Sequence, residues 1–252
     1  MDLGIQGKAA LVACASSGLG LGVARALAAE GAHVSICARG GERLAAAHRE
    51  LDSLGQGKVR SESVDMSDSA AVARWVENTR EEFGAVDIVI SHTGGVQQGT
   101  VGEFGVDDYR TAVGTTMLPH MALVVAATPY LKENGWGRLV LITSESVHQP
   151  MPHNVLSGVA RTGLHAYARN LADDFGRTGV TVNVLVPGYH RTPALRGPGG
   201  TDPDRAAREV PLGRVGDPDD FGALAAFLVS ARAAFVTGAQ LLVDGGNTRA
   251  PV

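Results

Sequence analysis

GRLVLITS at residues 137–144 and VTVNVLVPG at residues 180–188 are the segments that decide the fold. Each contains an apolar run of strand length, and residues 157–175 between them have the length and apolar spacing of a helix. Strand, helix and strand form a βαβ unit, and we expect its crossover to be right-handed. Ligands of open α/β sheets bind outside the carboxyl ends of the strands. Ser144, the start of the helix and residues 187–192 are therefore expected to line one crevice.

A second βαβ unit is predicted at the start of the chain, with strands at residues 8–13 and 33–37 and a helix at residues 21–30. Gly31 follows this helix as its expected left-handed C-cap. The turn ASSGLG, residues 15–20, joins the first strand to the helix, which is the context that a dinucleotide-binding motif requires. Free N–H groups at the helix start would bind a pyrophosphate. A plain tight turn is the alternative.

The remaining apolar patterns complete one α/β domain. Further strands are predicted at residues 59–64, 86–91 and 241–246, and further helices at residues 42–54, from about 67, at 109–130 and at 219–230. Pro119 is expected to kink the 109–130 helix. The fold class is therefore a single doubly wound Rossmann domain, residues 1–252, whose mostly parallel sheet of about seven strands is flanked by helices. Residues 191–210, which contain glycines and prolines, are interpreted as a substrate lid.

Composition favours a globular protein that binds a small molecule. The chain has 252 residues, 44% of them hydrophobic, and a net charge of −4. No basic cluster suggests nucleic-acid binding, and no apolar run of about 18 residues suggests a membrane span. We expect a cytoplasmic protein in which Cys14 and Cys37 stay reduced. No cluster of histidine and cysteine has the spacing of a metal site.

The order of motifs resembles the short-chain dehydrogenase/reductase family over almost the whole chain. Ser144 stands at the position of the family's serine, and Ser157 and Arg161 stand where the family has the tyrosine and lysine of Tyr-x-x-x-Lys. Thr116 stands at the family's fourth catalytic residue, an asparagine. The resemblance implies that Ser144, Ser157, Arg161 and Thr116 are the catalytic positions. It makes the chain a divergent member, with Ser-x-x-x-Arg in the active-site motif.

The resemblance also implies a nicotinamide cofactor. The positions that it assigns to cofactor binding are Cys14, Ser16, Ser17, Gly18, Leu19, Gly20, Arg39, Asp65, Gly94, Arg161, Pro187, Gly188 and Thr192. Cys14 replaces the first glycine of the family's glycine-rich turn, where it would crowd the backbone or fill a small buried space. Asp65 would accept a hydrogen bond from the adenine amino group, and it is equally suited to cap the helix that follows. His92 is interpreted as a polar residue at a strand end without a chemical role.

Arg39 decides the expected form of the cofactor. Family members that use NAD carry a carboxylate at the end of the second strand, where this chain has Ala38 and then Arg39. An arginine can pair with a 2′-phosphate, which a carboxylate would repel. We expect NADP(H), with NAD(H) possible and a solvated loop arginine as the alternative interpretation.

The Ser-x-x-x-Arg motif leaves open which reaction the site catalyses and which group donates the proton. The resemblance implies an oxidoreductase that interconverts a carbonyl and an alcohol, similar to 3-oxoacyl reductases. Arg161 can hold ribose hydroxyls and supply positive charge, but an aliphatic hydroxyl such as that of Ser157 is a weak acid with little reach. Water or a loop residue would then supply the proton, and His148, His153 and Tyr189 are the candidates. A non-redox lyase, isomerase, cyclase or cofactor-binding regulator on the same scaffold is the alternative.

The family also implies an assembly. Its members pair the helices that correspond to residues 109–130 and 157–175 across a two-fold axis. We expect a homotetramer, with a homodimer as the alternative, and a small-molecule substrate as the partner of the site.

Overall fold

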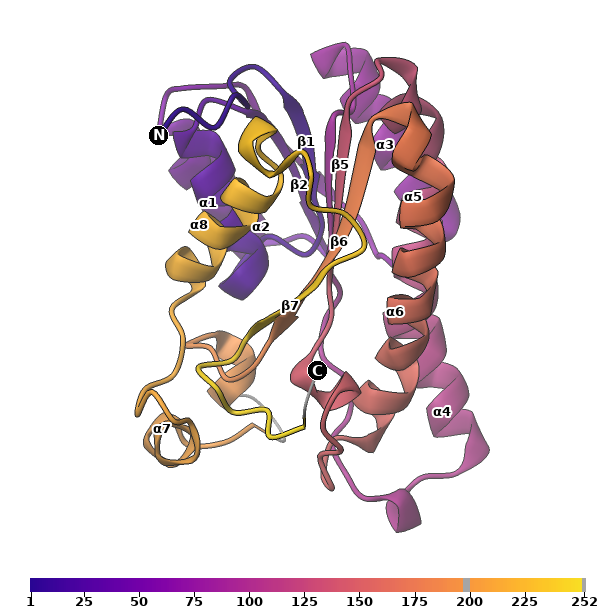
Figure 1. Ribbon diagram of the computed structural model, residues 1–252, viewed down its shortest axis with the longest axis vertical. Helices are drawn as coiled ribbons and strands as arrows, with labels where there is room; N and C mark the ends of the chain where they lie inside the picture. The colour runs from indigo at the N-terminus through magenta and orange to yellow at the C-terminus, as the bar shows by residue number, and fades with distance from the viewer. Residues whose placement is uncertain (197–199, 251–252) are drawn as a thin grey trace.

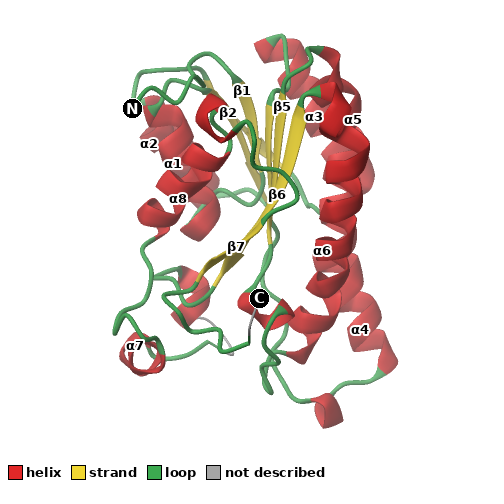
Figure 2. Ribbon diagram, in the orientation of Figure 1, coloured by secondary structure: helices red, strands yellow, loops and turns green. Residues whose placement is uncertain are grey.

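The computed structural model describes residues 1–196 and 200–250. Seven strands form one sheet in the order β3-β2-β1-β4-β5-β6-β7, and every neighbouring pair is parallel. Helices α1, α2 and α8 cover one face, and α3, α5 and α6 cover the other (Figures 1 and 2). This arrangement confirms the predicted doubly wound Rossmann fold.

The elements follow the predicted order with small differences at their ends. The strands are β1 (Ala9–Val12), β2 (His33–Ala38), β3 (Val59–Ser63), β4 (Ile88–Ser91), β5 (Gly137–Ile142), β6 (Val180–Pro187) and β7 (Gln240–Val243). The α-helices are α1 (Gly18–Ala29), α2 (Glu42–Asp52), α3 (Ser69–Phe83), α4 (Val106–Ala112), α5 (Leu118–Glu133), α6 (Val155–Phe175), α7 (Pro203–Glu209) and α8 (Pro218–Leu228).

The strands read as continuous apolar runs because both faces of the sheet are buried. In β1, Ala10 and Val12 belong to the core beneath α1 and α8, whereas Leu11 belongs to the core beneath α3, α5 and α6. Glycines bring α1 and α8 together: a Cβ on Gly22 would lie 2.1 Å from the carbonyl oxygen of Pro218. This close crossing fixes α1, and with it the turn that precedes α1, against the sheet.

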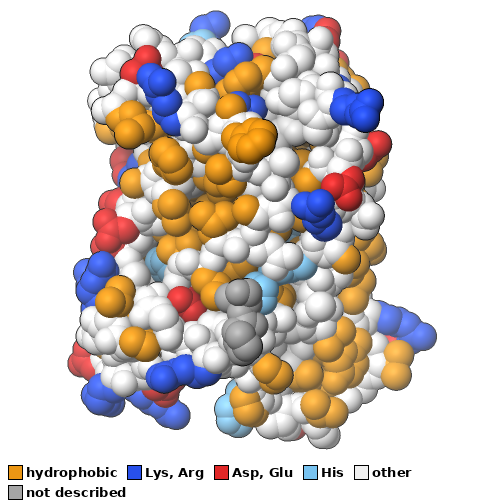
Figure 3. Space-filling model, viewed as in Figure 1, with side chains coloured by type: hydrophobic (Ala, Val, Ile, Leu, Met, Phe, Trp, Pro, Cys, Tyr) orange, Lys and Arg blue, Asp and Glu red, His pale blue; other side chains and the backbone are white. Residues whose placement is uncertain are grey.

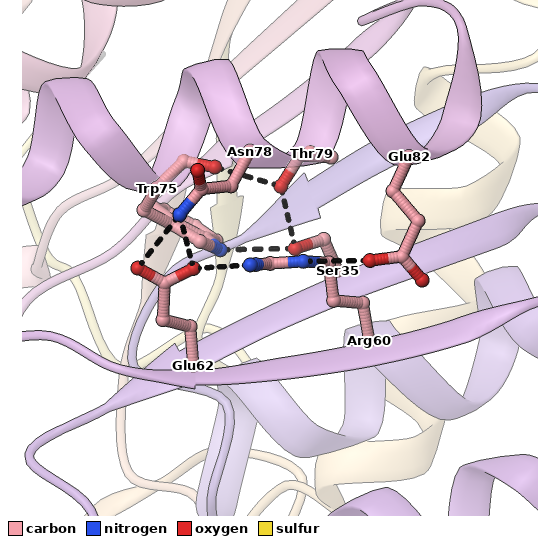
Figure 4. A network of polar contacts seen from close by, with 7 residues as sticks. All are labelled: Ser35, Arg60, Glu62, Trp75, Asn78, Thr79 and Glu82. Carbon is pink, nitrogen blue, oxygen red and sulfur yellow. Dashed lines mark hydrogen bonds and ion pairs between the residues drawn. The ribbon is translucent and has the colours of Figure 1, made fainter.

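A polar network holds α3 on the outer strands β2 and β3 (Figure 4). The Trp75 indole donates to Ser35 Oγ at 2.9 Å, and Ser35 Oγ is 2.8 Å from Thr79 Oγ1. Arg60 on β3 donates to Glu82 of α3 at 2.9 Å. Because Ser35, Trp75 and Thr79 are buried, the first two bonds satisfy polar groups that water cannot reach, whereas the Arg60–Glu82 pair lies at the surface. The network therefore fixes α3 against β2 and β3.

The start of α3 corrects one prediction about Asp65. The cap is Asp68, whose side chain accepts from the backbone N–H groups of Ala70 and Ala71. Asp65 instead accepts from the backbone and hydroxyl of Ser67, at 2.9 and 2.7 Å. Two residues, Met66 and Ser67, lie between Asp65 and Asp68, and they form a turn before the helix begins, so Asp65 is not the helix cap.

The predicted 109–130 helix contains a change of pitch. A π-helix, Val113–Met117, joins α4 to α5, and the Leu118 N–H bonds to the carbonyl of Val113. Pro119 follows this turn and has no N–H to offer the residue four positions before it. The π turn takes up the hydrogen bond that Pro119 cannot donate, so the change of helical pitch lies before Pro119 and not at it.

The segment predicted as a lid has some structure of its own. It contains a short 3₁₀ helix, Pro193–Arg196, and α7, while residues 197–199 lie outside the described residues. Leu195 and Ala206 pack with Val215 in a small apolar cluster apart from the main core. Its role as a lid stays a prediction.

Cys14 is the one described non-glycine residue with a left-handed backbone, at φ 53°. A side chain in this region costs about 1–2 kcal/mol because Cβ approaches the following carbonyl. The resemblance places a glycine at this position, and the structure gives the physical reason. Burial raises the pKa of the Cys14 thiol to about 11, so the side chain behaves as a small apolar group.

Two substitutions isolate the backbone effect at Cys14. Both Cys14→Gly and Cys14→Ala remove the thiol, but alanine keeps the strained backbone and glycine does not. We expect the Gly variant to exceed the Ala variant by about 1 kcal/mol in the free energy of unfolding, measured by urea denaturation. An Ala variant as stable as the Gly variant would contradict a left-handed Cys14.

Candidate active site

A cavity of about 680 Å³ opens at the carboxyl ends of the central strands. It reaches from the β1–α1 turn and the end of β2 to the start of α6 and the loop after β6. This is the place where the order of strands reverses, between β1 and β4. The lining residues include Ser144, Ser157 and Arg161, together with Pro187, Gly188 and Thr192, so the predicted crevice exists.

The β1–α1 turn faces the cavity through Cys14, Ser16, Ser17, Gly18 and Leu19. The Ser17 side chain does not cap α1, and the first turn of the helix carries no acidic residue. Backbone N–H groups at the helix start are therefore available to an anion, such as the pyrophosphate of a dinucleotide.

Gly20 has a different role from the one expected of a residue that contacts the cofactor. It is absent from the described cavity lining, and a Cβ there would lie 2.6 Å from the carbonyl oxygen of Cys14. Gly20 thus allows the turn to fold tightly onto the helix. With this tight turn and the free N–H groups of the helix start, the segment has the features that bind the pyrophosphate of a dinucleotide.

Two arginines line the end of the cavity beside β2 and α2. Arg39, at the end of β2, lines the cavity as expected, and Arg43 on the first turn of α2 lines it as well. The sequence interpretation missed Arg43, although it follows Arg39 by four residues. Asp65 lines the same end, and its two bonds to Ser67 lower the pKa of its carboxyl. This end therefore has two cationic side chains for one carboxylate.

A chain of hydroxyl groups links Ser144 to Arg161. Arg161 Nη1 donates to Ser157 Oγ at 2.7 Å, and Ser157 Oγ lies 2.9 Å from Ser146 Oγ. Ser146 Oγ then donates to Ser144 Oγ at 3.1 Å. Ser146, which the sequence interpretation missed, is the bridge. Its position two residues after Ser144, in the short 3₁₀ helix Glu145–Val147 that Ser144 begins, is the signal that could have found it.

The hydrogen-bond directions in this chain follow from the donors. Ser146 gives its one hydroxyl proton to Ser144, and Arg161 donates to Ser157, so Ser157 must donate to Ser146. Ser144 Oγ accepts a second bond from the Ser146 backbone N–H at 3.3 Å. The hydroxyl proton of Ser144 is therefore left for an acceptor in the cavity.

Arg161 is held between two elements. It lies one helical turn after Ser157 on α6, and its Nη2 donates to the Gly94 carbonyl beyond β4 at 3.0 Å. Only 6% of the residue is exposed, and burial lowers its pKa to about 10. The guanidinium stays charged at neutral pH. Gly94 itself lines the cavity, with no atom within 4 Å of a built Cβ, so a ligand can approach its backbone closely.

Thr116 does not reach the cavity. It is buried in the π-helix, its Oγ1 has no partner among the described residues, and its neighbour Thr115 lines the cavity instead. A π-helix rotates the side chains that follow it relative to a regular α-helix. The sequence position of Thr116 therefore does not reveal that Thr115 is the residue facing the cavity.

The three candidate proton donors on loops lie elsewhere. The His148 ring packs edge-on against His165, the exposed His153 accepts a hydrogen bond at its carbonyl from the Gly99 N–H, and the Tyr189 hydroxyl points to Glu209. None of the three is among the described residues that line the cavity. The prediction that they edge the crevice is not supported: His148 packs on α6, Tyr189 points to α7, and His153 pairs with the loop residue Gly99.

Two other histidines line the cavity, His92 and His190. Burial, and then the nearby Arg161 charge, lower the pKa of His92 to about 4, so its imidazole is neutral at neutral pH. His190 Nδ1 lies 3.0 Å from the Gly188 carbonyl, and the ring packs edge-on against Phe221. A neutral His92 is a hydrogen-bonding group and a weak base, and it adds no positive charge to the site.

Comparison with known proteins gives relatives over nearly the whole chain. Residues 13–248 match the family model described as enoyl-(acyl carrier protein) reductase. A D-beta-hydroxybutyrate dehydrogenase of Cupriavidus necator is 30% identical over 255 residues, which cover 96% of this chain and 98% of that protein. A D-threitol dehydrogenase of Mycolicibacterium smegmatis is 30% identical over 256 residues, covering 98% and 95%.

Solved structures agree with this relationship. L-sorbose reductase from Gluconobacter frateurii, complexed with NADPH and L-sorbose, has a TM-score of 0.93 at 27% identity, with 100% of both chains covered. A short-chain dehydrogenase from Burkholderia cenocepacia in complex with NADP has a TM-score of 0.88 at 30% identity, covering 96% and 98%. The fold, the nicotinamide-cofactor cavity and these relatives together show that the chain belongs to the short-chain dehydrogenase/reductase family and is a short-chain oxidoreductase.

Proposed function

We propose that the protein is an NADP(H)-dependent oxidoreductase that interconverts a ketone and a secondary alcohol, using a hydroxyl chain in place of the family's tyrosine and lysine. The observation that carries the proposal is the link from Arg161 through Ser157 and Ser146 to Ser144. This link joins a buried positive charge to a hydroxyl group that faces the cavity. The relatives solved with NADPH and with NADP support the choice of cofactor.

The cofactor residues divide along the cavity. The N–H groups at the start of α1, beside Ser17 and Gly18, would hold the pyrophosphate. Arg39 and Arg43 would hold the 2′-phosphate. Arg161 would lie near the nicotinamide ribose, as its family position implies. When bound, the nicotinamide supplies a hydride to a carbonyl carbon or receives one from an alcohol.

Ser144 is the residue that meets the reacting oxygen. Its free hydroxyl proton donates to the carbonyl oxygen, and the bond strengthens as that oxygen gains negative charge. Arg161 supports this change because its bond to Ser157 leaves each hydroxyl between them already oriented toward Ser144. Ser144 then gives its proton to the alkoxide. Ser146 gives its proton to Ser144, Ser157 gives its proton to Ser146, and water returns a proton to Ser157. One hydride and one proton thus convert the ketone to the alcohol.

Two exposed apolar surfaces support a tetramer. On α5 and α6, Val125 and Val159 are 68% and 52% exposed. Near the edge strand β7, Phe235 is fully exposed and Phe227 of α8 partly so, and hydrophobic side chains gather over this part of the molecule (Figure 3). We propose that each surface meets its own copy across a two-fold axis, which would give four subunits.

The apolar surface on α5 and α6 invites a second interpretation, a membrane-spanning helix. Residues Val106–Glu133 form a helical stretch long and apolar enough to cross a membrane by length and composition. Leu123, Ala127 and Leu131 of this stretch are fully buried in the core against the sheet. We therefore interpret its outer side as a subunit interface.

The first prediction concerns cofactor choice. Arg39→Ala and Arg43→Ala should each weaken NADPH binding by about 1–3 kcal/mol, the scale of one charged hydrogen bond, and leave NADH binding nearly unchanged. Fluorescence titration with both cofactors measures this. Equal losses for NADPH and NADH would mean that neither side chain contacts the 2′-phosphate.

The second prediction concerns the hydroxyl chain. Ser157→Ala should slow single-turnover reduction of a ketone by about 10- to 100-fold at saturating NADPH, the scale of one charge-assisted hydrogen bond, without weakening NADPH binding. Ser157→Thr keeps the hydroxyl and should recover most of the rate. An unchanged rate in the Ala variant, or no recovery by threonine, would remove Ser157 from the mechanism.

The third prediction concerns assembly. Val125→Glu and Phe235→Glu should each convert the tetramer to dimers, because a buried unpaired carboxylate disrupts one interface and leaves the other. The double variant should sediment as a monomer of 26.0 kDa. A wild-type protein that sediments as a monomer would refute the proposed assembly.

A further inference from the structure

Arg161 is a buried cation without an acidic partner in the described part of the chain. Its two hydrogen bonds go to the neutral oxygens of Ser157 and Gly94, and its Nε, which is also buried, has no partner there. Within residues 1–196 and 200–250 no ion pair involves Arg161, whereas Arg60 and Lys8 each pair with a carboxylate. A buried charge that lacks an opposite charge is costly.

The groups around Arg161 do not supply that opposite charge. His92 and His120 lie near it, and burial together with the Arg161 charge holds the pKa of each imidazole low, so both are neutral. Glu145 follows Ser144 in the sequence, but its carboxylate accepts from Asn247 and lies beside Gly188. This end of the cavity therefore has a positive charge that no described protein group cancels.

Asp65 is the one acid among the described residues that line the cavity, and it is at the far end. There it interacts with the Arg39 charge, which helps to lower the pKa of the Asp65 carboxyl. The ribose hydroxyls of a bound cofactor are neutral and could accept hydrogen bonds from Arg161 without balancing its charge. A ligand with its own negative charge would accept hydrogen bonds from Arg161 and also balance its charge.

We propose that Arg161 binds a carboxylate of the substrate, so that the enzyme acts on oxo acids and hydroxy acids in preference to neutral ketones and alcohols. This substrate class rests on the proposed redox function. Arg161 lines the cavity beside Ser157, whose short side chain stands where the family has a tyrosine ring. The guanidinium has five N–H donors, two of which are used, and its planar fork matches a carboxylate. Ser144 would then meet the carbonyl of the same molecule.

Matched acids and esters test the proposal. Pyruvate, acetoacetate and levulinate place a carboxylate at three distances from a ketone, and their methyl esters keep the ketone but lack the charge. With NADPH saturating, we expect kcat/KM for at least one acid to exceed that of its ester by at least about tenfold, a difference of about 1.4 kcal/mol. Stabilisation of the carbonyl oxygen alone would not favour the acids, because an ester group leaves the ketone at least as electrophilic as a carboxylate does. Esters that match their acids throughout would overturn the proposal.

Arg161 variants identify the residue responsible. Arg161→Gln keeps N–H donors and removes the charge, so the ratio of acid to ester should fall to about one, while Arg161→Lys should keep part of it. Arg191→Gln is the control, because Arg191 is an exposed arginine near the cavity and not among its described lining residues. A preference for acids that survives in Arg161→Gln, or that falls equally in Arg191→Gln, would overturn the assignment.

Calorimetry of the same acids with the protein alone separates this proposal from the proposed function. Binding that Arg161→Gln abolishes and Arg191→Gln preserves supports the carboxylate site, even if no compound oxidises NADPH. In that case the redox function fails and the site stands. If NADPH is oxidised equally with acids and esters, and no acid binds through Arg161, the redox function stands and the carboxylate site fails.

Discussion

The burial of the Arg161 guanidinium is the constraint on which the active site depends. The side chain starts on α6, reaches the Gly94 carbonyl beyond β4, and holds Ser157 at the start of a hydroxyl chain that ends beyond β5. Arg161 thus links α6 to the segment after β4 and, through Ser157 and Ser146, to the segment after β5. Since few protein groups nearby carry charge, the field of this cation acts on the oriented hydroxyls and on whatever occupies the cavity.

Much of the fold was predictable from local patterns. The apolar runs at β1, β5 and β6 and the glycine turn before α1 follow physical rules that need no tertiary contact. The position of Arg161 in the cavity was predictable as well, because a helix after a parallel strand must begin at the carboxyl edge of the sheet. The location of the crevice follows from the same reasoning, whereas the order of the strands in the sheet comes from the structure.

Other features depended on contacts between distant residues. Gly20 proved to be a packing position, and Thr116 is turned away from the cavity by a π-helix that a regular alignment does not reveal. The loop histidines were misplaced because loops carry no periodicity that fixes their direction. Ser146 gains its role only when α6 brings Ser157 to within 2.9 Å of it.

The proposed function requires that a serine and an arginine, in place of tyrosine and lysine, still support hydride transfer. Transfer of deuterium from NADPH labelled at nicotinamide C4 measures this step. We expect one of the two C4 labels to appear at the carbinol carbon of the alcohol product, with a primary isotope effect on the single-turnover rate. Product formed without label, or bound NADPH that transfers no deuterium to any ketone or oxo acid, would contradict the proposed function.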